Sequence, residues 1–338
     1  MRGAILYGER DVRFEDRPDP VITEATDAII RTVATCVCGS DLWPYRGIDR
    51  LRQPRAYGHE YVGIVEAVGS GVTTLQPGQF VVGGFYASDG TCAHCRAGFP
   101  FSCVRKSSFD GCQSEYIRIP QADGTLFATP EQPDDELVPH LLALSDVMST
   151  GWHAAVTARV GPGSTVAVVG DGAVGLSAVL AARELGADRI IAMSRHASRQ
   201  ALARDFGATD IVAERGDDGV AVIMELTDGV GADAVCEAVG TTESMTQAVQ
   251  SVRPGGMVGV VGVPHGVELP VQQMFFSNVG IKGGPASVPE YLPDLLDRVL
   301  SGKIQPGKVF DLQLPLSQVA EGYAAMDERR AIKTLLKP

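Results

Sequence analysis

A glycine-rich turn between an apolar run and a helical pattern constrains the fold of this chain more than any other feature. Residues 165–169 read TVAVV, which is typical of a strand buried on both faces of a parallel sheet. A turn with three spaced glycines follows, and a helical pattern then runs to Gly186. In this context the glycines permit the tight turn, the approach of the backbone to a pyrophosphate and close helix–strand contact, although an ordinary βα turn is the alternative. We therefore predict a dinucleotide site at a helix N-terminus, built from Gly170, Gly172, Ala173, Val174 and Gly175.

The rest of the chain divides into two kinds of pattern. From residue 146 to residue 284, predicted strands alternate with predicted helices, which indicates an α/β domain with a doubly wound parallel sheet. Residues 1–145 instead form short β-type runs broken by glycine and proline, and residues 285–338 are expected to return to that part as a helix and a short segment. A length of 338 residues suits two such domains.

The end of the second predicted strand, at residues 189–193, indicates which dinucleotide is bound. NAD sites commonly place an acid there, which accepts a hydrogen bond from the ribose 2′-hydroxyl. This chain has Ser194 at that place, followed by Arg195 and, within the next helix, Arg199. A serine hydroxyl and a guanidinium can bind a 2′-phosphate through charge-assisted hydrogen bonds, so the pattern predicts NADP. The alternative is that both arginines are solvated residues at the start of a helix.

Cys38, His59 and Asp146 stand in sequence contexts that suit the ligands of one catalytic zinc ion. A thiolate, an imidazole and a carboxylate leave the fourth tetrahedral position for a water or an alcohol oxygen. A lone buried cysteine is more commonly a small hydrophobic residue, so the three contexts carry this prediction only together. Glu60, beside His59, could orient a ligand or approach the metal itself.

A second group of cysteines lies between residues 89 and 103. Cys92, Cys95 and Cys103 begin with a C-x-x-C pair and predict a closed structural zinc site. Asp89 stands three residues before Cys92 and is the candidate fourth ligand, in competition with His94, Cys112 or a water. A metal-free loop of reduced cysteines is the alternative. Seven cysteines, an odd number, indicate metal binding in a reducing compartment rather than disulfides.

Charge and hydropathy exclude several classes of partner. The net charge of −12 makes a nucleic-acid backbone an unfavourable partner. No apolar stretch approaches the roughly 20 residues that a bilayer requires, and the first residues do not resemble a signal peptide. We expect a cytoplasmic protein without a membrane or nucleic-acid partner.

These residues together resemble the zinc-dependent medium-chain dehydrogenase/reductase family, the alcohol dehydrogenases, over essentially the whole chain. The most specific match is the family's zinc signature, Gly58-His59-Glu60-x-x-Gly63-x-x-x-x-x-Gly69-x-x-Val72. The resemblance implies a GroES-like catalytic domain and a Rossmann domain, with catalytic zinc on Cys38, His59 and Asp146. Aspartate at position 146 resembles a bacterial NADP-dependent secondary-alcohol dehydrogenase branch, in which Glu60 also belongs to the site.

The resemblance also implies roles for individual residues. Ser40 would hydrogen-bond the substrate oxygen, Thr150 would lie against the nicotinamide, and the strand end with Val261 and Val263 would lie beside that ring. Two positions depart from the family pattern: Trp43 replaces a relay histidine, and Asp89 replaces the first cysteine of the structural loop. The resemblance favours a homotetramer over a dimer.

The predicted activity is hydride transfer between NADP(H) and an alcohol, ketone or aldehyde. Zinc would act as a Lewis acid on the alcohol oxygen, while Ser40 removes or relays its proton. A polyol or sugar dehydrogenase is the alternative within the family, and Cys38 and His59 disfavour a zinc-free quinone or enoyl reductase. A non-catalytic NADPH-binding protein is the alternative of a different class, because a fold alone does not fix function.

Overall fold

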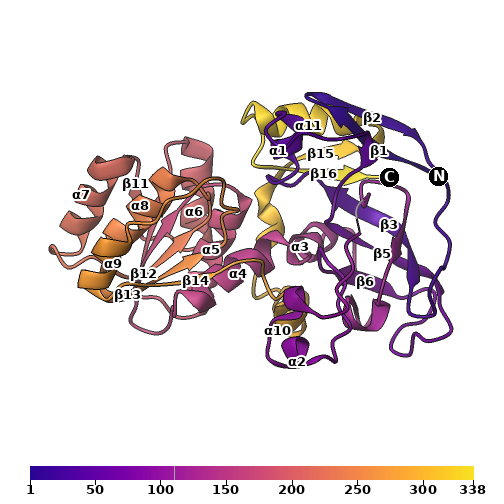
Figure 1. The fold of residues 1–338 in the computed structure, drawn as a ribbon, viewed down its shortest axis with the longest axis horizontal. Coiled ribbons are helices and arrows are strands. Elements are labelled where there is room, and N and C mark those ends of the chain that lie inside the picture. Colours follow the sequence, from indigo (N-terminus) through magenta and orange to yellow (C-terminus); the bar gives the residue numbers. More distant parts are fainter. Residues whose placement is uncertain (110) are drawn as a thin grey trace. The chain divides into compact units, whose positions relative to one another are not determined.

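The computed structural model describes residues 1–109 and 111–338, and the chain divides into two compact units. Unit 1 comprises Met1–Asp146 and Ser287–Pro338, and unit 2 comprises Val147–Ala286. Figure 1 shows that unit 1 is rich in strands and that unit 2 alternates strands with helices. The predicted fold class, a doubly wound parallel sheet plus a mostly β domain, is thus confirmed. No helix among the described residues is long and apolar enough to cross a membrane.

Unit 2 is built on a six-stranded parallel sheet with the order β11-β10-β9-β12-β13-β14. The chain begins in the middle at β9, runs outward through β10 and β11, and then crosses to β12 on the other side. Ligands of such sheets bind at the carboxyl ends of the strands where the order reverses, here between β9 and β12. The strands are β9 (Thr165–Val169), β10 (Arg189–Met193), β11 (Asp210–Val212), β12 (Ala232–Glu237), β13 (Val252–Val260) and β14 (Gly280–Gly283).

The helices of unit 2 connect these strands. Val166, Ala167 and Val168 of β9 have no exposed surface, as expected for a strand covered on both faces. Gly207, with φ of 116°, terminates α6 in the left-handed region, which glycine adopts without steric cost. The helices are α4 (Val147–Thr157), α5 (Ala173–Glu184), α6 (Ala197–Phe206), α7 (Gly216–Leu226), α8 (Thr242–Ser251) and α9 (Val271–Ser277).

Unit 1 contains a seven-stranded sheet with the order β15-β16-β3-β5-β6-β8, in which β7 also pairs with β3. A separate three-stranded sheet has the order β2-β1-β4. The strands are β1 (Arg2–Gly8), β2 (Asp11–Asp16), β3 (Ala28–Cys36), β4 (Arg55–Ala56), β5 (Tyr61–Val68), β6 (Phe80–Gly83), β7 (Tyr116–Ile119), β8 (Leu126–Ala128), β15 (Phe310–Pro315) and β16 (Lys333–Lys337). The helices are α1 (Leu42–Tyr45), α2 (Ala93–Arg96), α3 (Val138–Leu144), α10 (Val288–Leu300) and α11 (Val319–Asp327).

The C-terminal segment contributes more than the expected helix and short return. After α10 it supplies β15, α11 and β16, and β16 pairs antiparallel with β3 so that Leu335 faces Cys36. These strands were missed although residues 310–315 alternate apolar and polar side chains as a strand does; residues 333–337 start and end with lysine, which obscures their pattern. Their position matters because the end of β3 next to Cys38 then has neighbours on both sides, β16 and β5, whereas β7 pairs with its other end.

Candidate metal centres and dinucleotide site

The first candidate metal centre brings Cys38, His59, Glu60 and Asp146 together in unit 1. One ligand-type atom from each lies within 4.8 Å of the others. Cys38 Sγ is 3.7 Å from Asp146 Oδ2, and His59 Nε2 is 3.4 Å from the same oxygen. Sulfur, nitrogen and carboxylate oxygen are the donors that zinc binds in proteins, so the set fits a zinc ion.

The pairing of β3 with β5 explains how Cys38 and His59, which are 21 positions apart in the sequence, become neighbours. The strands are antiparallel with Thr35 opposite Tyr61, so the residues after β3 lie beside those before β5. The Thr35 hydroxyl donates to the Glu60 carbonyl at 2.7 Å and fixes this end of the pair. Gly58 has φ of 91°, and a Cβ there would lie 2.5 Å from Gln113, so the signature needs glycine at this position.

Asp41, which the sequence analysis did not single out, orients two of the candidate ligands. Its Oδ2 accepts hydrogen bonds from the Cys38 amide at 2.9 Å and from Gln113 Nε2 at 3.2 Å. Its Oδ1 lies 3.4 Å from His59 Nδ1. A carboxylate at Nδ1 leaves Nε2 to face a metal, which is a common arrangement around zinc-binding histidines. The only sequence signal was an acid three residues after Cys38.

The groups around His59 shift its pKa in opposite directions. Burial lowers the pKa of His59, but the carboxylates of Asp41 and Asp146 and the nearby Cys38 sulfur outweigh burial and raise it well above its ordinary value. Burial raises the pKa of the Cys38 thiol. A divalent cation would reverse this balance, because it favours the thiolate and the neutral imidazole as ligands.

Glu60 forms a buried ion pair with Lys333 of β16. Lys333 Nζ lies 2.6 Å from Glu60 Oε1 and donates to the Val37 carbonyl at 3.1 Å. Both side chains are only 1% exposed. Glu60 Oε2 is buried and has no hydrogen-bond partner among the described residues. Such an atom requires a partner, and a cation bound beside the other three candidate ligands would provide one.

Two other residues with predicted roles are Ser40, which lies near Cys38 in the sequence, and Thr150, which lies in unit 2. Ser40 is half-buried and belongs to the same turn as Cys38, where the Asp41 amide donates to the Cys38 carbonyl at 3.2 Å. Thr150 lies in unit 2, buried within α4.

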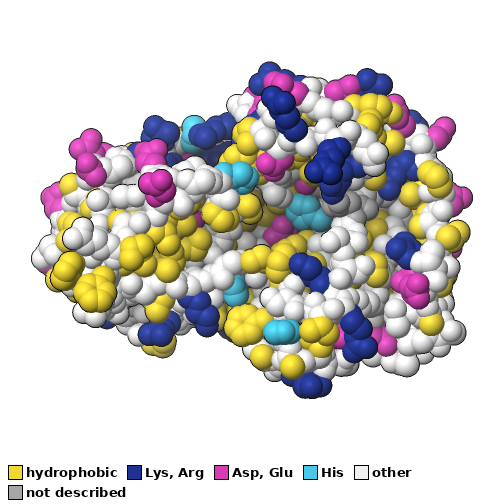
Figure 2. All heavy atoms as spheres, viewed as in Figure 1, with side chains coloured by type: hydrophobic (Ala, Val, Ile, Leu, Met, Phe, Trp, Pro, Cys, Tyr) yellow, Lys and Arg dark blue, Asp and Glu magenta, His cyan; other side chains and the backbone are white. Residues whose placement is uncertain are grey.

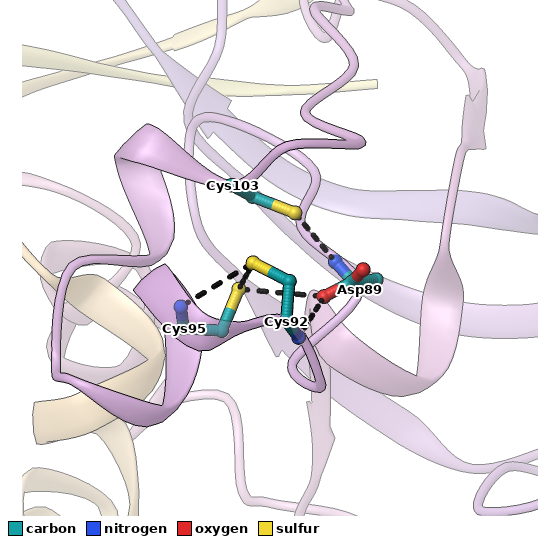
Figure 3. Close-up of side chains that lie close together, drawn as sticks. All are labelled: Asp89, Cys92, Cys95 and Cys103. Carbon is teal, nitrogen blue, oxygen red and sulfur yellow. Dashed lines mark hydrogen bonds between the residues drawn. The ribbon is translucent and has the colours of Figure 1, made fainter.

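The second candidate centre comprises Asp89, Cys92, Cys95 and Cys103, whose ligand-type atoms also lie within 4.8 Å of one another (Figure 3). Cys92 Sγ and Cys95 Sγ are 3.5 Å apart, and Cys95 Sγ is 3.4 Å from Asp89 Oδ1. Cys112 instead lies in the hydrophobic core of unit 1. The structure therefore places Asp89, rather than Cys112, beside the three thiols.

Asp89 and Cys92 are both biased toward their charged forms. Burial raises the pKa of Asp89, but hydrogen bonds from the Thr91 and Cys92 amides and from Arg105 reverse this effect and hold it well below its usual range. Amide donation, first from Cys95, lowers the pKa of Cys92 to about 7. Arg105 Nε is 2.7 Å from Asp89 Oδ2, so a cation from the protein offsets part of the negative charge of four anionic ligands.

The dinucleotide loop shows which of its glycines the protein itself requires. Gly170 has φ of 119°, and a Cβ at Gly175 would collide with the Gly170 carbonyl oxygen. A Cβ at Gly172 would meet no atom within 4 Å. The first and third glycines thus serve the turn and the helix–strand contact, while the second leaves open space at the N-terminus of α5. Open space at this position is what the close approach of a pyrophosphate would require.

The end of β10, where the sequence predicts that the adenosine ribose binds and which we call the proposed ribose pocket, has more charged groups around it than the sequence pattern indicated. Ser194 Oγ donates to Asp171 Oδ2 at 2.8 Å, so an acid from the glycine-rich loop reaches the end of β10. Arg199 lies 3.3 Å and Arg215 lies 3.8 Å from the same carboxylate. Arg195 is exposed. An acid between the first two glycines was the one available sequence signal for Asp171.

Val261 follows β13 directly, and Val263 lies two residues further on. The Val261 amide donates to the Glu237 carbonyl at 2.9 Å, which fixes the strand end, and Val263 is 53% exposed.

Comparison with known proteins finds matches for both units. Residues 24–131 match the model of an alcohol dehydrogenase GroES-like domain, and residues 173–301 match that of a zinc-binding dehydrogenase. Zinc-type alcohol dehydrogenase B of Aspergillus flavus is 34% identical, over 100% of this chain and 81% of its own length. The solved alcohol dehydrogenase of Thermus sp. ATN1 has a TM-score of 0.92 at 33% identity, covering 100% of this chain and 99% of that chain.

Solved structures of this fold differ in their cofactor. A zinc-binding dehydrogenase from Sinorhizobium meliloti bound to NADP has a TM-score of 0.82 at 26% identity, over 100% of this chain and 99% of that chain. A structure described as an NAD-dependent alcohol dehydrogenase has a TM-score of 0.85 at 27% identity, over 100% of both chains. The choice of dinucleotide therefore depends on the residues at the ribose pocket.

Proposed function

Because this chain belongs to the zinc-dependent medium-chain alcohol dehydrogenase family, we propose that it transfers a hydride between NADP(H) and an alcohol or the corresponding ketone or aldehyde. The observation that carries the proposal is the group of Cys38, His59, Glu60 and Asp146, with ligand-type atoms within 4.8 Å of one another. When bound, zinc supplies Lewis acidity toward the substrate oxygen, and the nicotinamide accepts or returns the hydride.

The side chains around that group have separate tasks in this proposal. Cys38, His59 and Asp146 hold the metal, and Asp41 fixes the orientation of the His59 ring through Nδ1. Ser40, on the same turn as Cys38, accepts the proton of the substrate hydroxyl or passes it on. Trp43 stands where related enzymes carry a relay histidine, so the proton leaves Ser40 through the cofactor ribose or through water.

Glu60 has a supporting role. Lys333 holds one carboxylate oxygen at 2.6 Å, so the other oxygen is the one left to approach the metal. The buried ammonium also compensates the charge of Glu60, which keeps a carboxylate beside the two other anionic ligands, Cys38 and Asp146.

We further propose NADP(H) as the preferred cofactor. Ser194, Arg199 and Arg215 gather around the end of β10, with exposed Arg195 beside them. Arginine suits a 2′-phosphate because its planar fork donates two hydrogen bonds to phosphate oxygens. The NADP complex of the Sinorhizobium meliloti structure agrees with this choice, and the NAD-dependent relative shows that the fold alone does not decide it.

The second centre is proposed to hold a structural zinc ion on Cys92, Cys95, Cys103 and Asp89. A closed four-ligand site would hold together a loop whose helix α2 spans only Ala93–Arg96. Reduced thiols of this kind fit a cytoplasmic location. With the catalytic site, the proposal requires two zinc ions per chain.

Homo-oligomerisation, with a tetramer favoured over a dimer, completes the proposal. None of the residues of α9 is buried, and Val271, Phe275 and Phe276 are 65%, 75% and 75% exposed. Figure 2 shows hydrophobic side chains gathered over this helix. Its neighbour β14 is the edge of the sheet. An apolar helix beside an open strand edge favours contact with another copy, which sedimentation analysis at several protein concentrations would detect.

A substrate panel tests the central proposal. Purified protein with a measured zinc content is assayed against primary alcohols, secondary alcohols, polyols and ketones by NADPH absorbance. Turnover that disappears in Cys38→Ala, with a near-native circular dichroism spectrum, supports zinc-dependent hydride transfer. Stoichiometric NADPH binding without turnover across the whole panel would instead support the non-catalytic alternative. Full activity in Cys38→Ala would contradict the proposed role of the metal.

A further inference from the structure

Asp171 places a carboxylate among the basic residues of the proposed ribose pocket. It stands between the first two glycines of the loop at 170–175, and its Oδ2 accepts a hydrogen bond from Ser194 Oγ at 2.8 Å. Arg199 lies 3.3 Å from Oδ1 and also donates to the Asp171 carbonyl at 3.2 Å. Arg215 lies 3.8 Å from Oδ2. One acid thus contacts the hydroxyl and two of the arginines.

The carboxylate of Asp171 takes the place of the acid that is missing at the end of β10. In NAD sites a carboxylate at the end of the second strand accepts a hydrogen bond from the ribose 2′-hydroxyl. Here β10 ends at Met193 and Ser194 follows it, but the carboxylate of Asp171 reaches the same place from another element. The pocket therefore contains the acceptor that suits a 2′-hydroxyl as well as the arginines that suit a 2′-phosphate.

Asp171 and a 2′-phosphate are electrostatic competitors in this arrangement. Both are anions, and both require the guanidinium groups of Arg199 and Arg215 as partners. The side chains of Asp171 and Arg199 are each only 11% exposed, so solvent screens their interaction weakly. A like-charge contact of this kind disfavours one ligand relative to another without affecting the rest of the site.

We propose that Asp171 is a specificity-determining residue that opposes the 2′-phosphate, limits the preference for NADP(H) and keeps NAD(H) usable. The inference rests on the proposed function in one respect, namely that Ser194 and the glycine-rich loop hold the adenosine ribose of a dinucleotide. In this proposal Asp171 disfavours the 2′-phosphate, whereas Arg195, Arg199 and Arg215 favour it.

Asp171→Asn tests the inference because it removes the charge and keeps the shape. The amide oxygen can still accept from Ser194, and Arg199 keeps its bond to the carbonyl of residue 171. Binding of 2′,5′-ADP and of 5′-AMP is measured by calorimetry, which needs neither turnover nor a substrate. We expect the preference for 2′,5′-ADP over 5′-AMP to rise about tenfold or more, since a repulsive contact is removed.

Asp210→Asn is the matched control. Asp210 also pairs with an arginine of this sheet, with Arg189 Nε and Nη2 at 2.9 and 3.0 Å, but it lies in β11, outside the glycine-rich loop and away from Ser194. Its loss should leave the ratio of the two affinities unchanged. Asp171→Ser provides a second uncharged variant, and it should shift the ratio in the same direction as Asp171→Asn.

The outcomes separate this inference from the proposed function. An unchanged or reduced preference for 2′,5′-ADP in both Asp171 variants would overturn the inference, since Asp171 would then be neutral or would position the arginines for the phosphate. Equal affinities in the unsubstituted protein would contradict only the NADP preference, and a rise in the variants would still support the role of Asp171. If the unsubstituted protein binds neither nucleotide, both proposals fail.

Discussion

Replacing Lys333 should cost more stability than replacing Lys333 and Glu60 together. The two charges lie 2.6 Å apart and are each 1% exposed. At an effective dielectric constant of about 20, their gross attraction is about 6 kcal/mol, most of which offsets the desolvation of two buried ions. Lys333→Met leaves Glu60 as an unpaired buried carboxylate and also removes the hydrogen bond to the Val37 carbonyl. We expect a loss of about 3–5 kcal/mol.

The double variant Glu60→Gln/Lys333→Met isolates the pairing. It removes both charges and keeps side chains of similar volume, so it should lose less stability than Lys333→Met alone. The assay is urea unfolding of the four proteins of the double-mutant cycle, followed by circular dichroism at equal zinc content. Additive losses from the two single variants would refute the reasoning, because they would show that the buried charges do not depend on each other.

Three further predictions concern the other sites. Asp89→Ala should make one of two zinc ions per chain easier to remove by a chelator, while Asp89→Cys retains it; unchanged retention in Asp89→Ala would make Asp89 an ordinary loop acid. Arg195→Ala should raise the KM for NADPH about tenfold and leave that for NADH nearly unchanged, by loss of a charge-assisted contact; equal effects on both cofactors would count against it. Burial and then the charge of Lys282 lower the pKa of His153 to about 4, so the folded state binds its proton less readily than the unfolded state. The neutral His153 therefore stabilises the folded state fully above pH 6.5, and the free energy of unfolding falls by up to about 3 kcal/mol as the pH drops from 6.5 to 4. His153→Phe should flatten this fall in pH-dependent unfolding, and parallel curves for the two proteins would contradict it.

Most features that could be predicted from the sequence have their chemistry within one short segment. The glycine-rich loop at 170–175 is such a case, because strand, turn and helix follow one another directly. The loop at 89–103 is another, since its C-x-x-C spacing already places two thiols on one helical turn. Cys38, His59 and Asp146, which lie far apart, could be grouped only because each stands in a context typical of a zinc ligand. The family, the fold class and the zinc alcohol dehydrogenase activity class, which rest on such local motifs, are confirmed.

Sequence reasoning missed the residues that act through strand pairing or across a turn. Lys333 lies 273 positions from Glu60, and no local pattern connects a lysine at the start of a C-terminal strand with a metal site. Asp171 was treated only as part of the glycine motif, because its contact with Ser194 requires the parallel pairing of β9 and β10. Residues 253–256, which read RPGG and have the composition of a turn, lie within β13, where a shift in the register with β12 accommodates the extra residues and Gly255 has φ of 74°.

The registers of three strands explain why the candidate metal cluster of Cys38, His59, Glu60 and Asp146 depends on the C-terminal segment as well as on residues 1–146. Strand β3 carries Cys38 just beyond its end and lies between β5, which begins after Glu60, and β16, which begins at Lys333. A slip of one residue in either pairing would turn the affected side chains to the opposite face of the sheet. The pairing of the C-terminal strand with β3 thus places Lys333 beside Glu60, where its ammonium compensates a carboxylate that lies near Cys38 and Asp146. The segment after residue 287 would thus support metal binding at the proposed site, although every candidate ligand precedes it in the sequence.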